Sequence, residues 1–167
     1  MIIKSYAKEY EVHFEKDPIF LKDLPSETGT YYVIDRNVYE LYKTQFTNVP
    51  EEKLYLLDAV ETNKTIEIAL AICEAMTAIP AKRNATLVSI GGGITQDITG
   101  FAANILYRGI HWIFVPTTLL AACDSCIGSK TSLNYRSYKN LLGTFYPPDE
   151  LHICPAMFAT LTKQDYL

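Results

Sequence analysis

Strand-like apolar runs alternate with helical patterns along the first two thirds of the chain, and this alternation limits the folds open to it. One of these runs, ATLVSI at 85–90, is apolar throughout and bounded by glycine, as expected for a strand covered on both faces. The sequence therefore predicts an α/β fold with a mostly parallel sheet and helices on both of its faces. The expected strands are residues 29–38, 53–60, 85–90 and 111–116, and the expected helices are residues 37–46, 65–79 and 95–108.

The two ends of the chain have weaker patterns. Residues 1–16 predict strand, with a hairpin as one arrangement. Thr62 and Asn63 are the candidate caps for the helix at 65–79. After residue 125 the pattern changes to short segments rich in Ser, Tyr, Asn and Pro, and residues 155–167 predict the start of a helix.

The composition is that of a folded domain. Of the 167 residues, 49% are hydrophobic and 20% are charged, so the chain is long enough and apolar enough to bury a core. Its net charge of −4 disfavours non-specific nucleic-acid binding. Because the sequence contains neither an apolar run of about 18 residues nor a signal-peptide pattern, we expect a cytoplasmic protein without membrane association.

Cysteine and histidine are not spaced as metal or redox motifs. Cys123 and Cys126 form a C-x-x-C without a second cysteine pair, so we expect small core residues on one helical face, and reduced thiols throughout. His13, His111 and His152 are scattered, and we expect surface or structural roles for them.

The glycines of GGGITQDITG, residues 91–100, follow a predicted strand and precede a predicted helix. Glycine lets a ligand approach the backbone, and the unpaired N–H groups of a helix N-terminus attract anions, so a phosphate or dinucleotide site is one interpretation. The other is a tight turn, with Gly100 allowing close helix packing. Asp97 could serve the helix dipole or bind a ribose hydroxyl. Other polar residues at strand ends, where ligands bind in such sheets, are Asp35, Asn37, Glu61, Lys64, Thr117 and Thr118.

A cationic stretch lies between Asp124 and Asp149, where acidic residues are absent. Lys130, Arg136 and Lys139 all fall within it. Such a patch suits a phosphorylated or carboxylated substrate, and the alternative is a solvated basic loop.

Four segments in this order, ETNKT, GGGITQDITGF, YRGIHWIFVPTTLLAACDSCIGSKTSLN and YKNLLGTFYPP, resemble the 3-dehydroquinate synthase family of sugar phosphate cyclases. The resemblance runs from about residue 30 to the end of the chain. It implies NAD bound between a Rossmann-like N-terminal domain and a helical C-terminal domain, and a divalent metal, zinc or cobalt. The implied reaction is cyclisation of a phosphorylated sugar acid with phosphate elimination, 3-deoxy-arabino-heptulosonate 7-phosphate to 3-dehydroquinate, in the shikimate pathway of aromatic amino-acid biosynthesis.

The resemblance also implies a cofactor site, residue by residue. The implied contacts on the adenosine side are Asp35, Asn37, Glu61 and Lys64. Those to the pyrophosphate and ribose are Gly92, Gly93 and Asp97. Those on the nicotinamide side are Thr117, Thr118 and Leu120, with Lys130 and Lys139 as further cofactor contacts. Phe158 and Thr160 fall in a segment that closes over the cofactor in the family.

The implied catalytic residues surround the substrate. Asp124 and Lys130 resemble the pair at the reacting centre, and Lys139 and Asn140 resemble ligands of the substrate carboxylate or phosphate. Arg108 resembles an arginine that reaches the substrate phosphate from the partner subunit, which implies a homodimer.

The sequence departs from the family pattern in detail and in length. Gln96 and Ser129 stand where the common pattern has glycine. The metal ligands of the family, one Glu and two His, belong to its helical domain, so we expect residues 1–167 to be the NAD-binding domain, inactive alone, with residues 150–167 leading into the absent domain. Sister cyclases that act on sedoheptulose 7-phosphate, glucose 6-phosphate or an amino analogue are alternatives, as are a polyol dehydrogenase and a non-catalytic nucleotide- or partner-binding protein.

Overall fold

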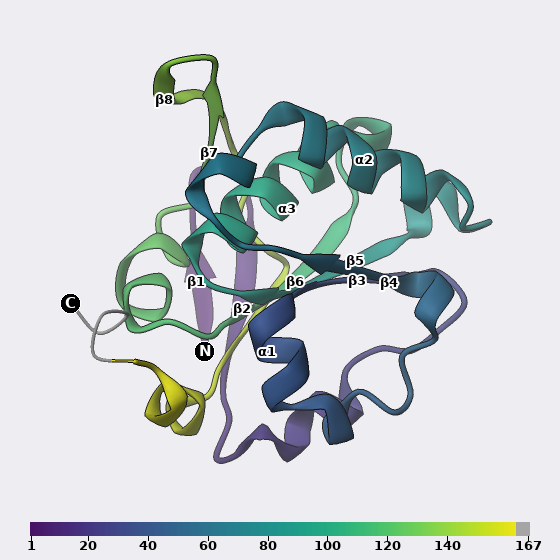
Figure 1. The fold of residues 1–167 in the computed structure, drawn as a ribbon, viewed down its shortest axis with the longest axis vertical. Helices are drawn as coiled ribbons and strands as arrows, with labels where there is room; N and C mark the ends of the chain where they lie inside the picture. Colours follow the sequence, from purple (N-terminus) through teal and green to yellow (C-terminus); the bar gives the residue numbers. More distant parts are fainter. Residues whose placement is uncertain (163–167) are drawn as a thin grey trace.

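A seven-stranded sheet forms the centre of the computed structural model, which describes residues 1–162 (Figure 1). The strand order is β1-β2-β9-β6-β5-β3-β4; β1 pairs antiparallel with β2, and the other pairs are parallel. These strands are β1 (Ile2–Lys4), β2 (Glu9–Phe14), β3 (Thr30–Asp35), β4 (Leu54–Leu57), β5 (Thr86–Gly91), β6 (His111–Pro116) and β9 (Glu150–Ile153). The predicted mostly parallel α/β sheet and the N-terminal hairpin are confirmed.

Helices cover both faces of the sheet. In Figure 1, α2 (Ile66–Thr77) and α3 (Gly93–Ile105) lie above the sheet, and α1 (Arg36–Leu41) lies below it. A π-helix spans Ala121–Ser125. The 3₁₀ turns are Pro18–Asp23, Lys43–Gln45, Glu51–Lys53, Glu61–Asn63, Lys82–Asn84, Leu106–Arg108 and Pro155–Thr160. Among the described residues, no helix is long and apolar enough to cross a bilayer.

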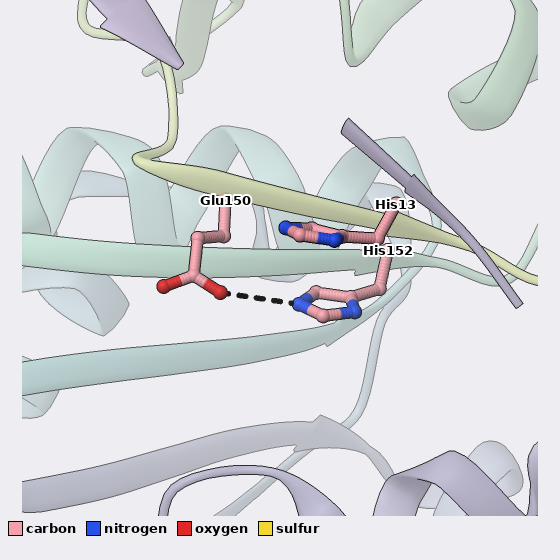
Figure 2. Close-up of side chains that lie close together, drawn as sticks. All are labelled: His13, Glu150 and His152. Carbon is pink, nitrogen blue, oxygen red and sulfur yellow. Dashed lines mark hydrogen bonds and ion pairs between the residues drawn. The ribbon is translucent and has the colours of Figure 1, made fainter. Parts of the chain in front are cut away.

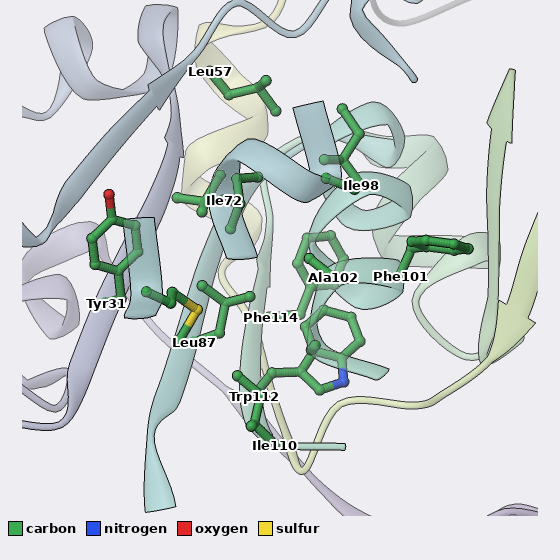
Figure 3. Close-up of a cluster of buried hydrophobic side chains, with 14 of the residues drawn as sticks. Tyr31, Leu57, Ile72, Leu87, Ile98, Phe101, Ala102, Ile110, Trp112 and Phe114 are labelled. Carbon is green, nitrogen blue, oxygen red and sulfur yellow. The ribbon is translucent and has the colours of Figure 1, made fainter. Parts of the chain in front are cut away.

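Strand β3 shows why the sheet needs two covering layers. Tyr31 and Val33 point into a core shared with α2 and α3, whereas Tyr32 and Ile34 point into a second core on the α1 side. All four are buried, so neither face can meet water without loss of apolar burial. Figure 3 shows the first core, in which Trp112 and Phe114 of β6 pack beside α3.

Two local predictions were wrong, and a third was right in position but not in helix type. The N-cap of α2 is Thr65, because a 3₁₀ turn occupies Glu61–Asn63. Helix α3 begins at Gly93 and ends at Ile105, because Tyr107 and Arg108 have φ values of 51° and 65°, which an α-helix excludes. The C-terminal segment forms a 3₁₀ turn over Pro155–Thr160; the rest of the helix predicted there lies mostly outside the described residues.

The region after residue 125 is more regular than predicted. It contains an antiparallel hairpin of β7 (Lys130–Tyr135) and β8 (Tyr138–Phe145), which projects from the sheet in Figure 1, followed by β9. Arg136 supplies a positive φ of 55° at the tip. Because this tight turn lacks the Asn-Gly or Asp-Gly pair that marks most hairpins, the sequence carries no clear signal for it.

Candidate functional site

A cleft of about 400 Å³ lies at the carboxyl ends of the central parallel strands, where ligands bind in such sheets. Seven residues expected to bind the cofactor line it: Asp35, Asn37, Gly92, Gly93, Thr117, Thr118 and Thr160. The sequence did not identify its apolar wall. That wall is formed by Val38, Leu41, Ala59, Ile94, Met157 and Leu161.

The floor of the cleft is the turn from β5 into α3. No described side chain caps the helix at Gly92, so N–H groups of its first turn are available to an anion. A Cβ at Gly92 would lie 2.9 Å from Thr118 Cγ2, whereas a Cβ at Gly93 would meet only Ser125 Oγ, at 4.0 Å. Gly92 therefore makes room for Thr118, and Gly93 leaves open space at the helix end.

The rim of the cleft carries a carboxylate at the end of β3. Asp35 is the N-cap of α1, and its Oδ1 accepts the Asn37 N–H at 2.8 Å. This bond fixes the carboxylate beside the glycine turn. A carboxylate at this edge can accept hydrogen bonds from the hydroxyls of a ligand.

Lys64 and Asp97 belong to a polar network around the buried Lys64 side chain instead of lining the described part of the cleft. Lys64 Nζ lies 2.6 Å from Asp97 Oδ2 and donates to Asn140 Oδ1 at 2.8 Å. Asp97 also accepts the backbone N–H of Ser132 at 2.9 Å and its hydroxyl at 3.0 Å. The network ties α3 to the segment that leads into α2 and to both hairpin strands. Sequence reasoning missed Ser132, because only pairing of distant segments brings it to Asp97.

Glu61 and Lys139 lie beside a separate cavity of about 650 Å³ near the hairpin tip. Asn134, which the sequence did not single out, donates from Nδ2 to Glu61 Oε1 at 2.8 Å, and its Oδ1 accepts the Asn140 N–H at 2.9 Å. Asn140 has a φ of 54°, a conformation that asparagine tolerates better than most residues.

Four other predicted site residues lie on the surface and one lies in the interior. Arg108, Leu120, Asp124 and Lys130 are exposed. Phe158 is buried, so of the two residues expected to close over the cofactor only Thr160 lines the described cleft.

The cationic stretch is not one patch. Lys130 pairs with Phe145 at the base of the hairpin, whereas Arg136 lies at its tip, beside Lys139. Five or six residues of extended chain separate the two ends, about 17–20 Å at the usual rise per residue. The three cations are adjacent in sequence, but the hairpin moves them apart.

The C-x-x-C was predicted to place both cysteines in the core, and this is wrong for Cys123, which is exposed on the π-helix. Cys126 is buried, and burial raises the pKa of its thiol to about 12. A redox pair needs an accessible thiolate, so this environment disfavours a redox role.

The two departures from the family pattern have distinct environments. Gln96 is buried, donates to Ser125 O at 2.7 Å and accepts the Ser125 hydroxyl at 2.6 Å, which links α3 to the π-helix. Ser129 has a φ of 59°, the left-handed region that favours glycine. Glycine at position 129 would therefore relieve backbone strain.

The histidines are less scattered than predicted. His13 and His152 lie on adjacent strands, with ring centroids 4.7 Å apart. His111 is partly exposed and lies 4.0 Å from Asp149. None of the three lines the described cleft.

Comparison with known proteins agrees with this geometry. A family model described as 3-dehydroquinate synthase N-terminal matches residues 54–167. The 3-dehydroquinate synthase of Caldanaerobacter subterraneus subsp. tengcongensis is 32% identical over 180 residues, covering 100% of this chain and 50% of the relative. That of Clostridium tetani is 35% identical over 146 residues, covering 86% of this chain and 39% of the relative. The chain thus spans half the length of these curated relatives or less.

Two solved structures of sugar phosphate cyclases have a similar fold. The 2-epi-5-epi-valiolone synthase of Streptomyces hygroscopicus subsp. jinggangensis, solved with NAD⁺ and Zn²⁺, superposes with a TM-score of 0.81 and 31% identity, over 93% of this chain and 46% of that one. A 2-deoxy-scyllo-inosose synthase, solved with carbaglucose-6-phosphate, NAD⁺ and Co²⁺, superposes with a TM-score of 0.79 and 27% identity. The match covers 96% of this chain and 47% of that one.

The parallel sheet, the cleft at its carboxyl edge and these likenesses define the sugar phosphate cyclase fold. Since the family model covers more than half of the sequence, the chain belongs to the 3-dehydroquinate synthase family, as the sequence motifs predicted.

Proposed function

We propose that this chain is the NAD-binding domain of a sugar phosphate cyclase. The observation that carries the proposal is the uncapped N-terminus of α3 with Gly93 open to the cleft. A pyrophosphate at this helix end meets free N–H groups and the positive end of the helix dipole. Asp35 and Asn37, at the end of the neighbouring strand, suit the hydroxyls of the adenosine half.

The residues present fit NAD. When bound, NAD supplies reversible hydride acceptance from a substrate hydroxyl. The chain's own contribution is to orient the cofactor: Thr117 and Thr118 on the nicotinamide side, and Gly93 under the pyrophosphate. Lys130 and Asp124 are the proposed polar groups at the reacting centre, with Lys139 and Asn140 on the substrate's anionic groups.

The proposed substrate is 3-deoxy-arabino-heptulosonate 7-phosphate, with 3-dehydroquinate as the product. The 3-dehydroquinate synthases among the relatives support this choice. A sister cyclase is the second candidate, favoured by the 31% identity to a valiolone synthase and by the departures at Gln96 and Ser129.

The metal of the family does not fit this cleft. Among residues 1–162, the one group of three His, Cys, Asp or Glu side chains close enough to hold an ion lies elsewhere on the sheet. We therefore assign no metal step to the cleft residues. We propose that activity requires the remaining half of the family's length, and a homodimer in which Arg108 reaches the partner subunit's substrate.

Phosphate release tests the substrate. The complete gene product that carries this sequence, supplied with NAD⁺ and Zn²⁺, should release phosphate from 3-deoxy-arabino-heptulosonate 7-phosphate, and Lys130→Ala should abolish release. Lys22→Ala, at an exposed lysine on the first 3₁₀ turn, is the matched control and should keep full activity.

The alternative functions predict different results when the substrate is varied and NADH absorbance is followed. Release from sedoheptulose 7-phosphate or glucose 6-phosphate instead would reassign the protein to a sister cyclase. Because a cyclase restores its cofactor each cycle, NADH absorbance should stay flat; steady NADH accumulation with glycerol would indicate a polyol dehydrogenase. NAD⁺ binding without turnover of any of these would favour a non-catalytic protein.

A further inference from the structure

Strands β2 and β9 bring acidic and imidazole side chains together on the face of the sheet that is opposite α2 and α3. The parallel register pairs Glu11 with Glu150 and His13 with His152. Because side chains alternate along a strand, these four residues share one face. Glu15 extends the same face, and its N–H donates to Ile153 O at 2.8 Å.

The geometry around His152 favours an ion between its ring and Glu150. Its Nε2 lies 3.4 Å from Glu150 Oε2 (Figure 2). Its Nδ1 lies 2.8 Å from Glu15 Oε1. With the proton on Nδ1 and donated to Glu15, the Nε2 lone pair faces a carboxylate. The 3.4 Å separation is long for a hydrogen bond, but it matches the edge of a tetrahedron with metal bonds of about 2.0–2.2 Å.

His13 supplies the third ligand. Its ring stacks on that of His152 with an interplanar angle of 16°. Its Nε2 is shielded from water and makes no hydrogen bond to any described residue, although Glu11 Oε2 lies 3.3 Å away. One ligand atom from each of His13, Glu150 and His152 lies within 4.8 Å of the others. Because the lone pairs of stacked rings lie in nearly parallel planes, the His13 ring has to turn out of the stack for all three atoms to bind one ion.

The local charge attracts a cation. Three carboxylates, those of Glu11, Glu15 and Glu150, surround the two imidazoles. In the described part of the chain, each of these carboxylates has its ion pairs with histidine, and none with lysine or arginine. A dication would offset this negative charge, since a neutral imidazole does not compensate the charge of a carboxylate and like charges repel.

The cluster of His13, Glu150 and His152 is open to solvent on one side. A cavity of about 380 Å³ is lined by His13 and Glu150, together with Glu9, Glu11, His111 and Asp149. It gives an ion access to His13 and Glu150, whereas His152 does not line it. The ring of Phe20 stacks on His152, with centroids 5.7 Å apart, and helps to hold that ring in place.

We propose that His13, Glu150 and His152 form a binding site for a divalent transition metal of the zinc class. Two imidazole nitrogens and one carboxylate oxygen are ligands that zinc prefers, and the Glu15 bond to His152 Nδ1 is the usual support of a metal-bound histidine. The ion joins β2 to β9, and none of its ligands lines the described cleft at the strand ends. The site therefore stands apart from the proposed cofactor function.

Cobalt titration of the chain tests the site. Co²⁺ alone, as a spectroscopic substitute for Zn²⁺, should give visible d–d bands that saturate at one equivalent. Glu150→Gln and His152→Gln should each weaken binding at least tenfold, and Glu15→Gln by about 10–100-fold. His111→Gln, which removes a histidine of the same cavity outside the cluster, is the control and should change binding less than twofold.

Calorimetry with Zn²⁺ and a melting curve complete the test. Zn²⁺ should raise the Tm of the chain and leave that of His152→Gln unchanged. In the complete gene product, His152→Gln should lower the bound zinc by one equivalent. Equal binding by the chain and by both ligand variants would overturn the proposal, as would thiolate-to-cobalt charge-transfer bands, which would place the ion on cysteine. Circular dichroism checks folding, and His13→Gln is the replacement if either variant unfolds.

Discussion

The first turn of helix α3 and its later turns differ in what they leave unsatisfied. Its first turn faces a cleft and has no described cap. This turn also contains Gly93, where an added Cβ would meet no close neighbour. Its later turns are fully engaged: Asp97 is paired with Lys64, and Gly100 packs against Thr131 and Trp112. One helix thus uses glycine for two purposes, to leave room for a ligand and to let other elements pack closely.

Removing Lys64, the cation that pairs with Asp97 in the later turns, should have the largest effect. Lys64→Ala leaves the Asp97 carboxylate, whose side chain is only 18% exposed, without its ion pair. We expect a loss of about 3–5 kcal/mol in the free energy of unfolding, measured by urea denaturation. Lys4→Ala, which breaks an exposed pair with Glu9, should cost less than about 0.5 kcal/mol. A loss below about 1 kcal/mol for Lys64→Ala would remove the contrast between the first turn and the later turns.

A methyl group at the packed glycine should have the next largest effect. In Gly100→Ala the added Cβ would lie 2.7 Å from Thr131 Cγ2 and 3.1 Å from Trp112 Cη2. Overpacking of this kind costs about 1–3 kcal/mol. Thermal unfolding followed by circular dichroism measures it, and an unchanged Tm would show that the hairpin shifts to accept the methyl group.

Substitution of a strained residue in the segment that leads into the hairpin should raise the stability of the protein instead of lowering it. Ser129→Gly places glycine at a φ of 59° and should stabilise the protein by about 1 kcal/mol. Ser137→Gly, at an exposed turn position without a positive φ at the hairpin tip, is the control and should give no gain. If both variants had equal stability, the strain at position 129 would be refuted.

Substitution of Gly93, the glycine that faces the cleft, should change the stability of the protein least. Gly93→Ala adds a Cβ with no close neighbour, so the free energy of unfolding should change by less than about 1 kcal/mol. If the pyrophosphate binds here, the same methyl group should weaken NAD⁺ binding at least tenfold. Calorimetric titration measures this, and unchanged affinity would place the cofactor away from this turn.

The sequence predicted the central elements because each carries its own periodic signal. The strand at 85–90 is apolar throughout, and GGG between strand and helix led to a cleft containing seven predicted residues. The hairpin was missed because its tip, Arg136–Ser137, has no glycine or asparagine to mark the turn.

The side-chain clusters could not be predicted because they depend on register between distant segments. Period-two alternation places His13 on one face of β2, but it does not say that β9 is the neighbouring strand or that His152 is the partner. The same holds for Ser132 and Asp97, which meet only when the hairpin packs on α3.

Strand β9 lies between β6 and β2, although its residues follow almost all of the others in the chain. On the ribosome, the N-terminal hairpin therefore has no main-sheet partner until residues 150–153 have been synthesised. At typical elongation rates this delay is about 10 s or more, long compared with the folding of a local hairpin. During that interval the edge of β2 is open to wrong partners, and charged side chains on an edge strand are the general means by which such pairing is disfavoured.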